Sequence, residues 1–247
     1  MKYYSFKNIR ATGIAEAICT PKGIGNWSVN DPEAVKNYAL LGNEFGLTPN
    51  DMVRAKQVHS ANVRVITRED AGEGIVRPLT HGDVDALVTN VPGLMLCTVE
   101  ADCTPVYLLD PVKKAIAMIH SGWKGTAAMI SANAISVMHE TYGSDPKDLL
   151  AAIGPCNCGL CYEVSDDLIP PFREGFGDDT ERYFTAKDNG KYLLDLKRAV
   201  HDTLVNSGIP AGNIETSPYC TYHDDLFYSW RKDKDPLVRM LTAIYLK

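Results

Sequence analysis

Six short apolar runs, which follow one another between residues 52 and 119, constrain the fold of this chain more than any other feature of its sequence. They cover residues 52–58, 62–67, 84–89, 94–99, 105–109 and 115–119, and they are rich in Val, Ile and Leu. Short runs of this composition, bounded by turn-forming residues, are typical of β-strands. Three more strands are expected over 149–153, 226–230 and 237–246, although the composition of the last run also permits a helix.

Helical spacing predicts helices on either side of these runs. The first is expected to begin with Asp31 as its cap and Pro32 in its first turn, and to end at Gly46. Three further helices are expected over residues 125–143, 165–176 and 196–208. No fixed-period repeat, low-complexity linker or change of composition divides the chain. We therefore predict one mixed α/β domain, of the α+β class, over residues 1–247.

Composition excludes several classes of protein. The net charge of -6 argues against a surface that coats nucleic acid, which would be basic. No stretch approaches the roughly 18 apolar residues of a membrane helix, and the N-terminus lacks the apolar core of a signal peptide. Because the seven cysteines are odd in number, we expect reduced thiols or metal ligands rather than a disulfide framework. A cytoplasmic monomer or small homo-oligomer, without nucleic-acid or membrane partners, is expected.

Three side chains suited to metal binding stand at the edges of the apolar runs. His59 ends the first run, Cys103 separates the fourth from the fifth, and His120 closes the sixth. Two imidazoles and one thiolate would leave a tetrahedral position open, as in a catalytic zinc site, which can polarise a substrate oxygen. The spacing matches no established metal motif. A structural cysteine with two histidines that cap the backbone is the alternative interpretation.

Two other segments suggest ligand binding. The sequence SGWKGT at 121–126 forms a turn that opens a helix, and the amides of a helix N-terminus suit an anion such as phosphate. An ordinary strand-to-helix turn is the alternative. Cys156, Cys158 and Cys161 either bind a second soft metal, sense oxidation, or are small residues in a tight loop. Of the four other histidines, three are expected to be structural: His81, His139 and His201.

Seven motifs, spread over nearly the whole chain, form a familiar set. They are QVHSANV at 57–63, DALVT at 85–89, ADCTPV at 101–106, HSGWKGT at 120–126, IGP at 153–155, YEV at 162–164 and FYSWR at 227–231. In this order they closely resemble the YfiH-type laccase-domain family, also called the polyphenol oxidase or purine nucleoside phosphorylase family. The resemblance implies a layered α-β-β-α sandwich. It also implies a metal, usually zinc and alternatively copper, bound by His59, Cys103 and His120.

The activity implied by the resemblance is phosphorolysis of inosine, guanosine and adenosine, with adenosine deamination as a second activity. Purine nucleosides and phosphate are then the partners. The three metal ligands are expected to be catalytic, with Asp102 as an orienting group or base and Gln57 beside the substrate. Contacts to phosphate or ribose are expected from Gly122, Lys124, Gly125, Arg231 and Arg239. The family's usual Thr-Gly-Arg is Leu237-Val238-Arg239 here, which keeps the cation without the glycine.

Two other enzyme classes remain open. A copper-dependent polyphenol oxidase of the laccase type needs a histidine-rich trinuclear cluster, yet the six histidines include no His-X-His pair. A metal-free hydrolase would use Cys103 as nucleophile and His120 or His59 as base, with cell-wall precursors as substrates. A non-enzymatic binding module gives no reason for reactive side chains at strand ends.

Overall fold

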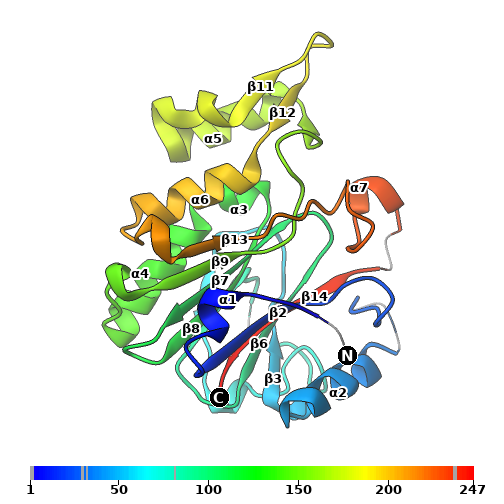
Figure 1. Cartoon of the computed structure of the whole chain (residues 1–247), viewed down its shortest axis with the longest axis vertical. Coiled ribbons are helices and arrows are strands. Elements are labelled where there is room, and N and C mark those ends of the chain that lie inside the picture. The colour runs from blue at the N-terminus through cyan, green and yellow to red at the C-terminus, as the bar shows by residue number, and fades with distance from the viewer. Residues whose placement is uncertain (1–2, 29–30, 32, 81, 236–237) are drawn as a thin grey trace.

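The computed structural model of the chain describes residues 3–28, 31, 33–80, 82–235 and 238–247, and it has a mixed α/β fold (Figure 1). Two large sheets form its centre. The first has the strand order β1 (Tyr4–Ser5), β2 (Ala15–Cys19), β14 (Met240–Leu246), β6 (Met95–Glu100) and β3 (Met52–Arg54). The second has the order β13 (Ile214–Thr216), β9 (Leu150–Ile153), β7 (Thr104–Asp110), β8 (Ala115–Ser121), β5 (Ala86–Thr89) and β4 (Val63–Val65).

Most neighbouring strands in these sheets are antiparallel. The exceptions are β3 beside β6, β13 beside β9 and β4 beside β5, which are parallel pairs. A third, small sheet has the order β10 (Glu163–Val164), β12 (Tyr192–Leu194) and β11 (Phe184–Ala186). Together with α5, this small sheet extends from one end of the molecule (Figure 1).

The α-helices are α1 (Lys7–Arg10), α2 (Ala34–Phe45), α3 (Trp123–Ala127), α4 (Ile130–Tyr142), α5 (Ile169–Phe176), α6 (Leu196–Asn206) and α7 (Trp230–Asp233). Short 3-10 turns cover Pro49–Asp51, Arg68–Asp70, Pro146–Asp148, Asp166–Leu168, Gly177–Tyr183 and Ala211–Asn213. None of the helices in the described ranges is long and apolar enough to cross a membrane.

Three apolar clusters show how these elements stack. Between the two large sheets, Leu96 of β6 packs in one buried cluster with Met118 of β8. Because side chains alternate along a strand, the residues next to Leu96 and Met118 in the sequence point to the outer faces of the two sheets. Met95 packs with Leu41 of α2 in a second cluster, and Ile119 packs with α4 and α6 in a third. The layers are therefore α2, five-stranded sheet, six-stranded sheet, and α4 with α6, which confirms the predicted α-β-β-α sandwich.

Several predicted elements differ in their bounds. The run 226–230 is not a strand: Phe227 is buried beside Cys19 and Met240, and Ser229 caps the short helix α7. The first apolar run leaves its sheet after Arg54. The helix predicted over 125–143 is two helices, because the backbone of Met129 is left-handed with a φ of 61°.

The other helix predictions hold with small shifts. Helix α2 begins at Ala34 rather than near Asp31, although the Asp31 carboxylate accepts a hydrogen bond from the backbone N–H of Glu33 at 2.8 Å. It ends at the left-handed Gly46, as predicted. The segment 165–176 forms a 3-10 turn followed by α5, which has proline in its first turn. Three residues named in the sequence analysis lie outside the described residues: Pro32, His81 and Leu237.

Candidate active site

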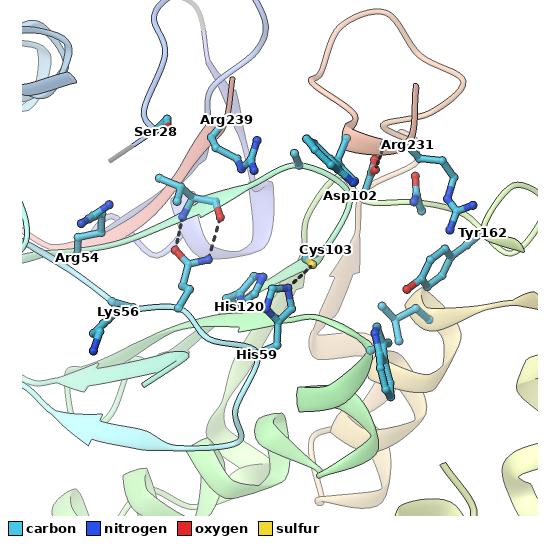
Figure 2. A pocket seen from close by; sticks show the side chains of 18 of the residues that line it. Ser28, Arg54, Lys56, His59, Asp102, Cys103, His120, Tyr162, Arg231 and Arg239 are labelled. Atoms are coloured by element: carbon cyan, nitrogen blue, oxygen red, sulfur yellow. Dashed lines mark hydrogen bonds between the residues drawn. The ribbon is translucent and has the colours of Figure 1, made fainter. Parts of the chain in front are cut away.

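Strand alternation brings the three predicted metal ligands to one end of the space between the large sheets. On β8, Ile116 and Met118 point into the inter-sheet core, and His120, two residues further on, points into the same layer. Cys103 lies immediately before β7, and His59 approaches from the loop between β3 and β4. The ligand atoms of these three residues all lie within 4.8 Å of one another. Figure 2 shows them at the centre of the site, where His59 Nε2 is 3.7 Å from Cys103 Sγ.

The buried carboxylate of Asp85, at the edge of β5, holds both histidines. It accepts hydrogen bonds from the backbone N–H groups of His59 at 3.0 Å and Ser60 at 2.7 Å, which bind the loop in a conformation where φ of His59 is 64°. Its Oδ1 also lies 2.7 Å from Nδ1 of His120. Burial would raise the pKa of Asp85, but the hydrogen bonds from His120 and Ser60 lower it to about 2. Asp85 is therefore an anion that orients the His120 ring and fixes the backbone of His59.

A second buried carboxylate, Glu100 at the end of β6, lies on the other side of His120. Its Oε1 accepts a hydrogen bond from the hydroxyl of Thr98 at 2.8 Å. Its Oε2 has no hydrogen-bond partner and is 3.6 Å from Nε2 of His120. Burial raises the pKa of Glu100 to about 8. The site thus contains a carboxyl group whose second oxygen faces the ligand cluster.

The two neighbouring carboxyl groups also shift the pKa values of the metal ligands. Burial would lower the pKa of His120, but the ionised forms of Glu100 and Cys103 and the bond to Asp85 raise it well above its ordinary value. Burial would raise the pKa of the Cys103 thiol, but the charge and hydrogen bonds of His120 and His59 lower it to about 6. Cys103 is therefore mostly a thiolate at neutral pH, which is the form that binds metals or attacks a substrate.

Gly122 and Gly125 let the start of α3 approach the other ligands. A Cβ atom on Gly122 would lie 2.6 Å from Cδ2 of His59 and 3.2 Å from Sγ of Cys103. A Cβ atom on Gly125 would lie 2.9 Å from the carbonyl oxygen of Ser60. Close packing against the His59 loop therefore explains both glycines. Their predicted contact with phosphate stays a prediction.

A cavity of about 730 Å³ opens beside the three ligands, within the size range of small-molecule sites. Five cationic side chains line it: Arg54, Lys56, Arg231, Lys234 and Arg239. Three large aromatic side chains also line it: Trp123, Tyr162 and Trp230. Figure 2 shows Arg54 and Lys56 on one side of the ligand cluster, and Arg231 with Tyr162 on the other. The cavity therefore combines positive charge with flat apolar surfaces.

Asp102 and Gln57 line this cavity, but hydrogen bonds to the protein occupy their side chains. The two Asp102 oxygens accept hydrogen bonds from the Thr221 hydroxyl and from the backbone N–H of Arg231, both at 2.7 Å. The Gln57 amide donates to the Val99 carbonyl and accepts from the Val99 N–H, both at 2.8 Å. Both side chains therefore hold the cavity wall, and their predicted catalytic roles stay predictions.

The predicted cationic contacts are distributed unevenly around the cavity. The guanidinium carbon of Arg231 is 5.0 Å from the ring centroid of Tyr162, and that of Arg239 is 5.7 Å from the ring centroid of Trp230. Lys124 is exposed and is not among the residues that line the cavity. Arg231 and Arg239 are therefore better placed than Lys124 to meet a bound anion.

Several residues of the site were not predicted to have a role there, among them Asp85, Glu100 and Arg54. Asp85 and Glu100 are charged residues at the ends of apolar runs, and this was the available signal for them. Arg54 ends β3 and is buried, and its Nε has no hydrogen-bond partner. Its position inside an apolar run was the available signal, because a buried charge is costly unless it has a partner.

Comparison with known proteins places the chain in a family. The family model described as "Multi-copper polyphenol oxidoreductase laccase" matches residues 5–247. The chain is 34% identical over 220 residues to "Purine nucleoside phosphorylase YlmD" of Bacillus subtilis (strain 168), covering 88% of this chain and 78% of that protein. It is 31% identical over 209 residues to "Adenosine deaminase RL5" of an unknown prokaryotic organism, covering 84% and 79% respectively.

A solved structure agrees with this relationship. The crystal structure of Bacillus licheniformis hypothetical protein YfiH superposes with a TM-score of 0.89 at 34% identity, covering 94% of this chain and 93% of that one. The sequence match and the shared fold both extend over nearly the whole chain. It therefore belongs to the family of multi-copper polyphenol oxidoreductase laccases, as the motifs at 57–63, 101–106 and 120–126 predicted.

Proposed function

We propose that this chain is a metal-dependent purine nucleoside phosphorylase that acts on inosine, guanosine and adenosine and also deaminates adenosine. The observation that carries the proposal is the cluster of His59, Cys103 and His120 beside a cavity with cationic and aromatic walls. The names of the two relatives support the two activities.

The three ligands suit a zinc ion. Zinc bonds of about 2.3 Å to sulfur and about 2.0 Å to nitrogen give a tetrahedral sulfur–nitrogen edge of about 3.5 Å, close to the 3.7 Å between Cys103 and His59. The Nδ1 atom of His120 faces Asp85, which leaves its Nε2 for the metal, and the absent Cβ of Gly122 keeps the cluster open. When bound, zinc would act as a Lewis acid toward a substrate oxygen. Copper is the alternative metal, since the same donor set also suits it.

The cationic side of the cavity supports a phosphate site. Arg54 is buried, and its unpartnered Nε is a donor without an acceptor. Lys56 and Arg239 line the same cavity, so a dianion there would be surrounded by positive charge. Arginine pairs with phosphate through two parallel hydrogen bonds. We expect these residues to hold phosphate with one oxygen directed at C1′ of the ribose.

The aromatic side supports a purine site. Tyr162 carries Arg231 against its ring and lines the cavity together with Trp123 and Trp230. Aromatic rings stack on purine bases whatever their substituents, which fits a protein that accepts several nucleosides. The cluster of His59, Cys103 and His120 then faces the ribose between the two sides.

In the proposed reaction, a phosphate oxygen forms a bond to C1′ while the bond from C1′ to the purine N9 breaks. The purine leaves with that electron pair and takes up a proton, and the sugar leaves as ribose-1-phosphate. Positioning and charge stabilisation account for most of the catalysis, because phosphate is itself the nucleophile. For deamination, water adds at C6 of adenosine and ammonia leaves.

Product analysis tests this proposal. Purified protein is given adenosine or inosine, with and without phosphate, and the products are separated by chromatography. Base and ribose-1-phosphate are expected only with phosphate, while inosine from adenosine is expected without it. The variant His120→Ala should lose both activities, and His201→Ala on α6 should keep them. No turnover of either nucleoside by metal-loaded protein would refute the proposal.

Two observations favour rival activities in the same site. The lowered pKa of Cys103 beside His59 also fits a cysteine hydrolase acting on cell-wall precursors, which would keep its activity after a chelator removes the metal. The description of the family model fits copper-dependent oxidation of phenols. Copper-loaded protein that oxidises a phenol but leaves nucleosides unchanged would support that rival.

A further inference from the structure

A second group of metal-binding side chains lies outside the candidate active site. It consists of Cys158, Cys161, Cys220 and His223, whose ligand atoms all lie within 4.8 Å of one another. In the sequence they form two pairs of the same spacing, Cys-X-X-Cys at 158–161 and Cys-X-X-His at 220–223. Two such pairs from separate segments are typical of structural zinc sites. The sequence analysis grouped Cys158 and Cys161 with Cys156, whereas the fold places them beside Cys220 and His223.

Distances within this cysteine cluster fit a tetrahedral metal. Zinc bonds of about 2.3 Å to sulfur and about 2.0 Å to nitrogen give edges of about 3.8 Å between two sulfurs and about 3.5 Å between sulfur and nitrogen. The Cys158–Cys161 and Cys161–Cys220 sulfur distances are 3.7 and 3.5 Å, and Cys158 Sγ is 3.6 Å from Nδ1 of His223. The sulfurs are far beyond the bond length of about 2.05 Å in a disulfide.

We propose that Cys158, Cys161, Cys220 and His223 bind a structural zinc ion, distinct from the metal of the active site. Three thiolates and one imidazole fill a tetrahedral shell and leave no position for substrate, as in structural rather than catalytic sites. This inference does not rest on the proposed function, since it concerns other residues.

Backbone hydrogen bonds fold both loops of the cluster. The Tyr162 N–H donates to the Cys158 carbonyl at 3.3 Å, and the Asp224 N–H donates to the Cys220 carbonyl at 2.9 Å. Cys156, the third cysteine of the segment noted in the sequence, is buried and lies outside the group of four.

The site joins the segment 157–162, which lines the active-site cavity through Asn157 and Tyr162, to the segment 220–223. The Thr221 N–H donates to the Cys156 carbonyl at 3.1 Å, and the Thr221 hydroxyl donates to Asp102, next to the active-site cysteine. Tyr162, which follows Cys161, lines the cavity and carries Arg231 on its ring. A zinc ion there would fix the loop at 157–162 to the loop at 220–223. It would therefore hold Asp102 and Tyr162 in place without contacting substrate.

Metal analysis of purified full-length protein tests the site, with zinc as the probe. In the variant His59→Ala with His120→Ala, the active-site ligands are removed, and one zinc per chain should remain by elemental mass spectrometry. Adding Cys158→Ser and Cys161→Ser should reduce this to less than one tenth of a zinc. The matched control is Cys156→Ala, which removes a neighbouring buried thiol and should keep the zinc. Because the first variant lacks the active-site ligands, the result is independent of whether the proposed function is right.

A second measurement covers the case in which the cysteine variants fail to fold. Wild-type protein, unfolded with a chelator under anaerobic conditions, should release zinc together with seven reactive thiols. Less than half a zinc per chain in the His59→Ala, His120→Ala variant would overturn the proposal. So would iron in place of zinc, or a disulfide that lowers the thiol count to five.

Discussion

The substitution Asp85→Asn gives a sharp test of how the active site is held together. The two Asp85 oxygens accept hydrogen bonds from two groups of donors. One group is the His59 N–H with the His120 ring, and the other is the N–H and hydroxyl of Ser60. Asparagine keeps one oxygen and replaces the other with a donor, so one group of donors must face an NH₂.

The structure sets the size of the expected effect. A buried donor left without an acceptor costs about 1–3 kcal/mol. The same hydrogen bonds lower the pKa of Asp85 from 3.8 to about 2, which corresponds to about 2 kcal/mol of stabilisation at roughly 1.4 kcal/mol per pKa unit. Carboxylates that orient metal-binding histidines change metal affinity by about 10–100-fold when replaced. We expect Asp85→Asn to lose about 2 kcal/mol of unfolding free energy and at least about 10-fold in zinc affinity.

Denaturant unfolding of the metal-free protein and zinc competition against a chromophoric chelator measure these two quantities. Since the folded-state pKa of Asp85 is lowered, its contribution is complete above pH 4 and is lost as the pH falls toward 2. The variant should lose that part of the pH dependence. Asp110→Asn is the matched control, because Asp110 is also buried but its Oδ2 has no partner to lose. Unchanged zinc affinity and stability in Asp85→Asn would refute this account of the site.

Three further substitutions test the neighbouring features. Gly122→Ala should lower zinc affinity at least about 10-fold, because its Cβ would lie 2.6 Å from the His59 ring. Gly82→Ala is the control, since it has open space around it and should keep the affinity. Titration of both variants with zinc measures the two affinities. Arg54→Ala should raise the KM for phosphate about 10-fold or more, with little change in the KM for nucleoside. Steady-state kinetics measure both KM values, and Arg173→Ala, at an exposed arginine, is the control. Equal changes in both KM values would contradict a phosphate role. Tyr162→Ala should raise the KM for inosine about 10-fold, since stacking on a base contributes about 1–3 kcal/mol; an unchanged KM would remove Tyr162 from the purine site.

Most strands could be predicted because the apolar runs have strand length, whereas the α-β-β-α layers were expected from the resemblance of the motifs to a known family. Alternation along the strand explains the direction of His120, which follows Met118 by two residues and Ile116 by four, both in the inter-sheet core. The run at 226–230 was predicted wrongly as a strand because apolar composition does not distinguish a strand from a loop. There Phe227 is buried by aromatic packing, and Ser229 with Asp233 caps a helical turn.

The rest of the site could not be predicted because it depends on contacts between distant segments. His59 was expected at a strand end, yet its position comes from Asp85, 26 residues away in the sequence. Gln57 has the residue type of a substrate contact, but its amide pairs with Val99 of the neighbouring strand. Cys220 and His223 lie about a quarter of the chain beyond Cys158 and Cys161 in the sequence. The parallel bridge between Cys156 and Cys220 brings the two pairs together in the fold.

The ligands of the active site come from segments that meet only when both large sheets have formed. Cys103 and His59 are 44 residues apart, and His120 and Asp85 are 35 apart, on different strands and loops. A metal ion that binds this arrangement therefore binds the native state and not the unfolded chain. At a free metal concentration of 1,000 times Kd, this preference adds about 4 kcal/mol to the free energy of unfolding. Metal supply would then change the stability of the folded protein as well as its activity.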